Sequence, residues 1–299
     1  MKKLYIIRKK NDIVNLGDDM KKRKMKKGPK IILLIMLLII LGIGILSILQ
    51  KETPKKELTR KEKLVNKMEK ISYYRKENKE RYIKYQKENQ SLSIEDIITQ
   101  VNIGIDNPYY TNTKPSDNLN TNLILVNKYN YVTEDYIPEN LEPLDTNYAR
   151  SGMQLVKEAK EAFEELSQNA KENGMTILAM SSYRSYDYQV NLYNNYVKSD
   201  GQEAADTYSA RAGYSEHQTG LAADVYNGEV PYTSFEETEE FTWMQENAYK
   251  YGFILRFPKD KTNITGYQYE SWHYRYVGKE VAKEIHENNL TLEEYLARK

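Results

Sequence analysis

The sequence predicts an α+β fold, in which a small, mostly antiparallel sheet is flanked by helices. Three short apolar runs, TILAM (176–180), LAADV (221–225) and FILRF (253–257), have the length and composition of buried strands. The segment YESWHYRYV (269–277) alternates aromatic and polar residues, which is typical of a strand. Helical patterns separate these runs. A long apolar segment near the N-terminus predicts one transmembrane helix, and the charged stretch after it predicts a helical stalk before this domain.

Composition excludes one large class of function. The 299 residues carry 44 Lys and Arg against 43 Asp and Glu, a net charge of +1. A dedicated nucleic-acid binder has a strong basic excess, so we expect no nucleic acid as a partner. A chain of this length can hold one or two domains.

The N-terminal part predicts a membrane anchor. Residues 1–30 are lysine-rich and include KKRKMKK, and the nineteen residues 31–49 are all apolar or small. At ~1.5 Å per residue this run can cross a bilayer core of ~30 Å. A buried core helix need not be apolar on every side. A cleaved signal peptide would need a small-residue site after the run, where the sequence instead reads SILQKETP. An uncleaved anchor is therefore favoured.

Residues 50–115 predict a helical stalk and a connector. Leu64, Met68 and Ile71 recur at helical spacing within a stretch rich in lysine and glutamate, which favours a solvated helix. Residues 91–118 turn to branched apolar residues and then to Asn, Pro and Asp, so a short capped helix and an irregular connector are expected there.

The C-terminal domain is expected over residues 116–299. A short strand at 123–126 and an extended arm at 136–144 lead into a long helix from about 147 to 173, whose apolar stripe faces the core and which stops at Gly174. Beyond the first strand, we expect helices beginning near Gln189 and covering 203–209, 238–250 and 279–288, a turn at 258–266, and a last short helix from Leu292.

The stretch GYSEHQTGLAADV (213–225) carries two candidate metal ligands, His217 and Asp224. Imidazole and carboxylate together suit zinc, and a catalytic site usually has three protein ligands. The chain has no cysteine and three histidines. His286 lies in a polar helical pattern and is expected in solvent, whereas His273 lies in the aromatic strand, so His273 is the predicted third ligand. Asp224 is also inside an apolar run, where an unpaired carboxylate would be costly.

Arg184 follows the strand TILAM, in the block SSYRSYDYQ. Its planar guanidinium suits a carboxylate or a developing oxyanion. A surface salt bridge is an equally good reading from the residues alone.

The blocks SSYRSYDYQ, SEHQTGLAADV and ESWHYRYVG, in this order and spacing, resemble the VanY-type zinc D-alanyl-D-alanine carboxypeptidases. The resemblance covers roughly residues 127–278, including the lead-in LVNKYNYVTEDYIPENL. It implies that Arg184, Gln189 and Ser215 contact substrate, and that Arg184 stabilises oxyanion charge or holds the substrate's carboxylate.

Glu270 is the expected general base of such a zinc site. Period-two alternation would place residues 270 and 273 on opposite faces of a strand. Glu270 is therefore predicted at a bulge or at the strand's entry. Trp272 is expected to pack beside the site.

The resemblance implies hydrolysis of the terminal D-alanine from peptidoglycan stem peptides. Whether the preceding residue is a D- or an L-centre stays open, as do a peptidoglycan endopeptidase of the same fold and a catalytically silent wall-binding module. Lysines flank both sides of the apolar run, so charge leaves the orientation nearly tied. Since this substrate lies outside the cell, we expect a single-pass membrane protein with its C-terminal domain outside, acting as a monomer.

Overall fold

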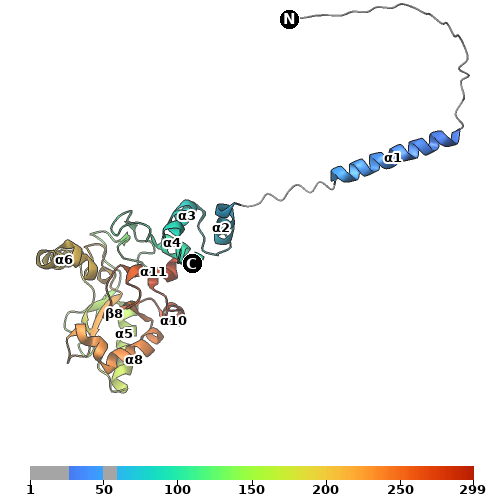
Figure 1. The fold of residues 1–299 in the computed structure, drawn as a ribbon. Coiled ribbons are helices and arrows are strands. Elements are labelled where there is room, and N and C mark those ends of the chain that lie inside the picture. Colours follow the sequence, from blue (N-terminus) through green and yellow to red (C-terminus); the bar gives the residue numbers. More distant parts are fainter. Residues whose placement is uncertain (1–26, 50–58) are drawn as a thin grey trace, which may run out of the picture. The chain divides into compact units, whose positions relative to one another are not determined.

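The structure, a computed structural model, describes residues 27–49 and 59–299 (Figure 1). It divides into two units, Met1–Leu58 and Thr59–Lys299. In the first unit, α1 (Lys27–Leu49) is one helix, and its described large apolar side chains are exposed. The predicted basic segment 1–30 lies outside the described residues except for its last four.

The predicted anchor coincides with α1. Among the residues that the structure describes, no helix is found that is long and apolar enough to cross a membrane. The anchor at 31–49 is not supported by this finding and stays a prediction.

Residues 60–103 form a compact helical cluster. Ser93 caps the last of its helices by accepting a hydrogen bond from the backbone N–H of Asp96, and Gly104 ends it in a left-handed conformation. Met68, Tyr82 and Ile97 are buried between the helices. The helices are α2 (Arg60–Met68), η1 (Lys76–Asn78), α3 (Lys79–Glu88) and α4 (Ile94–Ile103).

This cluster differs from the solvated stalk expected from the sequence. Asn102 Nδ2 donates to the carbonyl of Ala297, and Arg298 Nε donates to Thr99 Oγ1 at 3.2 Å. The cluster thus contacts the C-terminal helix α11 (Leu292–Ala297) and belongs to the same compact unit. The physical reason is that the apolar stripe of one short helix is buried by the next two.

The connector contains short strand pairs where a longer strand and helix were expected. No strand forms at 123–126; Ile124 and Val126 are buried in irregular backbone, and the Ile124 carbonyl accepts a hydrogen bond from Arg275. The extended arm at 136–144 contains a strand. The pairs are β1 (Lys114–Pro115) with β2 (Asn130–Tyr131), parallel, and β3 (Leu141–Pro143) with β4 (Gln154–Val156), antiparallel.

The long helix begins ten residues later than predicted, as α5 (Lys157–Glu172). The residues before it are used by β4, and Gly152 has a φ of +84° that a helix cannot accommodate. Ala159, Phe163 and Leu166 of the predicted stripe are buried in the main core, whereas its first two residues, Leu155 and Val156, lie in β4.

The central sheet has four strands in the order β5-β6-β8-β7, and every neighbouring pair is antiparallel, which confirms the predicted α+β fold with a small antiparallel sheet. One face, including Val225 and Tyr274, packs with α5 in the main core. The opposite face holds Asp224 and His273, since side chains alternate along a strand. The strands are β5 (Leu178–Ser181), β6 (Ala222–Tyr226), β7 (Phe253–Phe257) and β8 (Glu270–Tyr276).

The remaining helices agree with the predicted pattern to within a few residues. Three short helical segments, η2, η3 and α9, were not predicted, and α9 lies in the expected turn at 258–266. These elements are α6 (Tyr186–Asp200), α7 (Gln202–Tyr208), η2 (Glu216–Thr219), η3 (Tyr232–Glu237), α8 (Glu239–Asn247), η4 (Ala248–Tyr251), α9 (Thr262–Thr265) and α10 (Lys279–Glu287).

Candidate metal centre

The sheet brings Asp224 and His273 together, because they are direct partners in the register between β6 and β8. His217 lies in the short helix η2, which leads into β6 through Gly220. Gly220 has a φ of +68°, and a Cβ there would lie 2.8 Å from Leu141 Cδ2. Glycine therefore permits the sharp turn that places His217 above the strand carrying Asp224.

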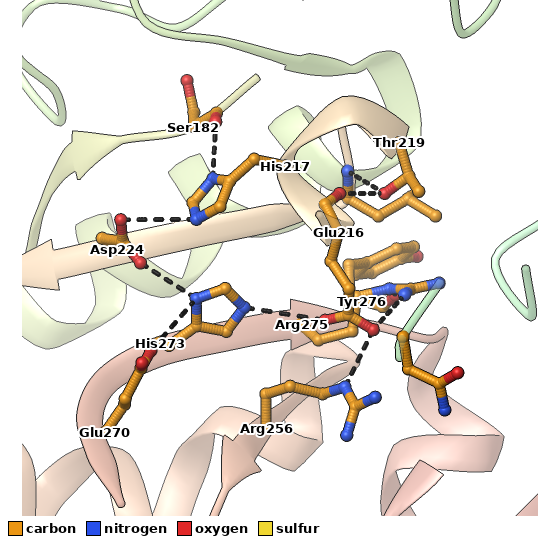
Figure 2. Close-up of polar contacts among 12 residues, drawn as sticks. Ser182, Glu216, His217, Thr219, Asp224, Arg256, Glu270, His273, Arg275 and Tyr276 are labelled. Atoms are coloured by element: carbon orange, nitrogen blue, oxygen red, sulfur yellow. Dashed lines mark hydrogen bonds and ion pairs between the residues drawn. The ribbon is translucent and has the colours of Figure 1, made fainter. Parts of the chain in front are cut away.

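The three side chains present their ligand atoms to one another (Figure 2). Asp224 Oδ2 lies 3.4 Å from His217 Nε2, and Asp224 Oδ1 lies 3.0 Å from His273 Nδ1. All three ligand atoms lie within 4.8 Å of one another, and all three residues are buried. Ligand atoms around a tetrahedral zinc, bound at ~2.0–2.1 Å, lie about 3.3 Å apart. The spacing therefore fits a zinc ion.

Hydrogen bonding selects the tautomer of His217. Its Nδ1 lies 2.7 Å from the Ser182 carbonyl oxygen, which can only accept, so Nδ1 carries the proton. Burial and the nearby Arg184 lower the pKa of His217, which keeps the ring neutral. The lone pair of Nε2 then faces the carboxylate of Asp224. Two buried acceptors with no proton between them form a place for a cation.

His273 and Asp224 share a proton in the metal-free protein. Burial disfavours the charged imidazole, but the carboxylates of Asp224 and Glu216 raise the pKa of His273 to about 9. Burial would raise the pKa of Asp224, yet His217 and Arg184 hold it well below its usual value. A cation at the cluster would take the place of the proton on His273 Nδ1.

Glu270 is the first residue of β8, and the register between β7 and β8 shifts between Leu255 and Phe257, opposite that entry. The strand's entry and an irregularity therefore coincide, as predicted. Glu270 Oε2 lies 3.8 Å from His273 Nδ1. Burial raises the pKa of Glu270 to about 8, against the lowering effect of His273.

Arg184 reaches the same cluster from the end of β5. Its Nη2 donates to Asp224 Oδ2 at 2.6 Å and to Ser181 Oγ at 2.7 Å, and its backbone N–H donates to the His217 carbonyl. The Arg184 side chain is 20% exposed, and its ion pair is with the buried Asp224 of the cluster.

Gln189 and Ser215 line the cleft beside the cluster, and both are buried. Gln189 lies in α6 and donates through Nε2 to the Ala210 carbonyl, while its Oε1 has no partner among the described residues. Ser215 directly precedes η2. His286, by contrast, is exposed on α10 and stacks on Tyr249, so it is separate from the cluster, as expected.

The cleft has an accessible volume of about 220 Å³ and strongly aromatic walls. Trp272 is half-buried and packs edge-to-face on Tyr232, with ring centroids 5.0 Å apart. It contacts a neighbouring ring, as expected, and it also lines the cleft. The other aromatic wall residues include Tyr196, Tyr208, Tyr214 and Tyr267.

A buried ionic group lies next to His273 and was not predicted from the sequence. Arg256 and Arg275 both donate to Glu216 Oε1 at 2.8 Å, and Arg256 also forms an ion pair with Glu293. The available signal is an arginine inside each of two buried strands, FILRF and ESWHYRY. A charge in such a position is costly unless it is paired.

Comparisons with known proteins agree on one family. A family model described as VanY: D-alanyl-D-alanine carboxypeptidase matches residues 152–279. Over 207 residues the chain is 41% identical to YodJ of Bacillus subtilis (strain 168), a provisionally assigned carboxypeptidase; the match covers 65% of this chain and 76% of that protein.

Two solved structures share both fold and sequence. The LdcB LD-carboxypeptidase aligns with a TM-score of 0.59 and 40% identity, covering 63% of this chain and 91% of that one. The vancomycin-resistance D,D-pentapeptidase VanY, solved with Zn(II), aligns with a TM-score of 0.52 and 36% identity, covering 58% of this chain and 98% of that one.

Proposed function

Since the chain belongs to the VanY family of D-alanyl-D-alanine carboxypeptidases, we propose that it is a zinc-dependent metallopeptidase that removes the C-terminal D-alanine of peptidoglycan stem peptides. The observation that carries the proposal is the convergence of His217 Nε2, Asp224 and His273 Nδ1 beside the buried carboxyl of Glu270. The cleft beside them has an accessible volume of about 220 Å³, and these four residues line it.

Zinc is the proposed cofactor. Two imidazole nitrogens and one carboxylate match its preferred ligands, and three protein ligands leave one position for water or substrate. A bound Zn²⁺ would polarise the scissile carbonyl and lower the pKa of a water molecule. The solved VanY structure that contains Zn(II) supports this choice of metal.

Glu270 is the proposed general base. It takes the proton of the attacking water and passes it to the leaving amine. In the metal-free protein burial raises the pKa of Glu270 to about 8, so the carboxyl is protonated at neutral pH. A positive charge at the neighbouring ligands would lower that pKa and leave a carboxylate that can accept a proton.

Arg184 is the proposed electrostatic partner of the substrate. Its guanidinium lies at the cleft and is held by Ser181 and Asp224, so it can stabilise oxyanion charge or hold the terminal carboxylate of the peptide. Gln189 Oε1 has no hydrogen-bond partner among the described residues, and Ser215 lies at the cleft wall. Both are proposed to contact the peptide.

The stereochemistry of the penultimate residue defines a second candidate function. The family description names D-alanyl-D-alanine, whereas the LdcB structure is of an LD-carboxypeptidase with 40% identity. The same zinc, base and arginine can act on either bond. The alternative is therefore an L,D-carboxypeptidase.

One experiment separates these activities. The zinc-loaded Thr59–Lys299 protein is incubated with a stem pentapeptide ending in D-Ala-D-Ala and, separately, with a tetrapeptide ending in an L-centre followed by D-Ala. Mass spectrometry follows the loss of one alanine. Faster cleavage of the pentapeptide supports the D,D activity, and faster cleavage of the tetrapeptide supports the L,D activity. Loss of alanine from neither peptide would contradict the proposal.

We also propose that residues 31–49 attach the protein to the cell membrane and that the C-terminal domain lies outside, where peptidoglycan is found. The support is the uninterrupted apolar run in the sequence and its helical conformation in α1. Protease added to wall-stripped intact cells should digest the C-terminal domain; full protection would contradict this placement.

The unit Thr59–Lys299 contains every proposed site residue, so we propose that it acts as a monomer. Light scattering of the active protein measures this directly. A dimer as the only active species would contradict it.

A further inference from the structure

We infer that Glu216 is a positioning residue, which holds the ring of His273 through Nε2 and thereby presents Nδ1 to the metal. The inference rests on the proposed zinc site, and it adds a residue that is neither a ligand nor the base. Glu216 directly precedes His217 in η2, but its side chain points to the other histidine (Figure 2).

Two buried polar atoms of Glu216 and His273 face each other. His273 Nε2 and Glu216 Oε2 each have no hydrogen-bond partner among the described residues, and they lie 3.6 Å apart. A good N–H···O bond is about 2.9 Å long, so a small rotation of the imidazole would close the gap. Buried polar atoms without partners are uncommon, and each such atom requires an explanation.

The plane of the His273 imidazole is already restricted by packing. The His217 ring lies edge-on to His273 with centroids 5.0 Å apart, and the Phe257 ring lies against it at 4.9 Å. These contacts restrict the plane of the ring. They do not select which nitrogen of His273 carries the proton, because ring packing makes no hydrogen bond to either nitrogen. That selection is left to the groups at the two ring nitrogens.

Glu216 is held rigidly enough to make the selection. Its Oε1 accepts hydrogen bonds from Arg256 Nε and Arg275 Nη1, both at 2.8 Å, and all three side chains are almost completely buried. The guanidinium of Arg275 is fixed in turn by the carbonyls of Asn122 and Ile124. Oε1 is therefore committed to the arginines, and only Oε2 is directed at His273.

A carboxylate oxygen can only accept, so Oε2 requires a proton on His273 Nε2. A neutral imidazole with its proton on Nε2 has its lone pair on Nδ1, the nitrogen that faces Asp224. Glu216 thus selects the tautomer that can bind a metal. A carboxylate placed behind a ligating histidine is a known way to orient the ring and increase its basicity.

Glu216→Gln tests this tautomer selection directly. Because two arginines donate to Oε1, the amide oxygen of the glutamine should face them, and its NH₂ group should face His273 Nε2. That group donates, so it favours the tautomer with the proton on Nδ1, which cannot bind the metal. We expect the affinity for Zn²⁺ to fall ~10-fold to 100-fold, the usual loss when such a partner is removed.

Glu293→Gln is the matched control. It removes one negative charge from the same buried group, in which Glu293 accepts hydrogen bonds from Arg256. Among the described residues, no hydrogen bond or ion pair joins Glu293 to His273. Both variants should lower the Tm of the metal-free protein, because each weakens buried ion pairs. Only Glu216→Gln should weaken zinc binding, measured by competition with a chromophoric chelator.

The outcomes are distinct. Equal zinc affinities of Glu216→Gln and wild type, or equal losses in both variants, would show that Glu216 only balances buried charge and would overturn the inference while leaving the zinc site intact. A wild-type protein that binds no zinc would overturn the proposed function and this inference with it.

A measurement on the wild type keeps the test independent of variant folding. The chain has three histidines, so ¹⁵N-labelled histidine gives few signals. In the zinc-loaded protein we expect a slowly exchanging proton on His273 Nε2 and none on Nδ1. A proton on Nδ1 with the metal on Nε2 would overturn the inference.

Discussion

Asp224 and His273 are paired residues on adjacent strands, and Asp224 Oδ1 lies 3.0 Å from His273 Nδ1. Both strands are interior to the sheet order β5-β6-β8-β7. Side chains on interior strands are held by neighbours on both sides, so the separation of these two groups is set by backbone pairing. A ligand pair of this kind is formed when the sheet forms, before any metal binds.

The first prediction concerns metal content. The zinc-loaded Thr59–Lys299 protein should contain one Zn²⁺ per chain by atomic absorption, because one three-ligand cluster is found among the described residues. His217→Ala should reduce the content to near zero. The matched control is His286→Ala, which changes an exposed histidine on α10 and should leave it unchanged. Stoichiometric zinc after His217→Ala would contradict the ligand assignment.

The ligand set could be predicted because its chemistry is visible in residue types. A chain with no cysteine and three histidines offers few zinc ligands, and a carboxylate inside LAADV requires a partner. The position of Glu270 at the start of its strand followed from the alternation of side chains along a strand, which would otherwise place residues 270 and 273 on opposite faces. Glu216 could not be found this way, because its role depends on Arg256 and Arg275 meeting it from strands that are distant in sequence.

The second prediction is that zinc binds more tightly as pH rises. The neighbouring carboxylates raise the pKa of His273 to about 9, so below pH 9 the ring of the metal-free protein carries a proton that zinc must displace. Each displaced proton makes the apparent affinity rise about tenfold per pH unit. His217 does not add to this pH dependence near neutral pH, because burial lowers its pKa and the ring is already neutral.

Chelator competition at pH 6, 7 and 8, with proton release measured in weak buffer, checks this slope. Glu270, whose pKa burial raises to about 8, would steepen the slope if it also loses its proton. An affinity that is flat between pH 6 and pH 8 would contradict the shared proton between His273 and Asp224.

The fold could be predicted where the sequence of one segment determines its secondary structure. It could not be predicted where contacts with distant segments determine it. The strands TILAM, LAADV and FILRF and the helices after them agree with the structure. The helix expected from residue 147 begins at Lys157, because β3 pairs with the residues in between. The many lysines and glutamates at residues 60–88 predicted a solvent-exposed helix, although Tyr82 and Met68 are buried against α4.

The third prediction concerns the N-terminal boundary of the folded unit. A protein of residues 59–299 should have the Tm of the full chain, whereas a protein of residues 116–299 should unfold at a lower temperature. The shorter protein loses Tyr109 and Tyr110, whose rings pack around Lys128, and it loses α4, which contacts α11. Burying one large apolar side chain contributes about 1.5–3 kcal/mol.

A loss of about 3 kcal/mol would lower the Tm by roughly 6–12 °C in a domain of this size. Differential scanning calorimetry of both proteins measures the difference, and circular dichroism checks that each is folded. Equal melting temperatures would show that residues 59–115 do not stabilise the domain, as a solvated stalk would not.

The last prediction separates the role of Glu270 from that of the ligands. Glu270→Gln should keep zinc and bind peptide, because the amide has nearly the same shape, but it cannot accept the proton of the attacking water. Turnover should fall ~10²-fold to 10⁴-fold, the usual contribution of a positioned acid–base group. Activity on stem peptides and zinc content are measured on the same sample.

Two further variants serve as controls for this comparison. His273→Ala should lose zinc and activity together, because it removes a ligand. Glu165→Gln changes an exposed glutamate on α5 and should change neither. If Glu270→Gln keeps both zinc and near-normal turnover, another group must activate the water. The buried carboxyl 3.8 Å from His273 Nδ1 would then be a structural neighbour of the metal ligands and not the base.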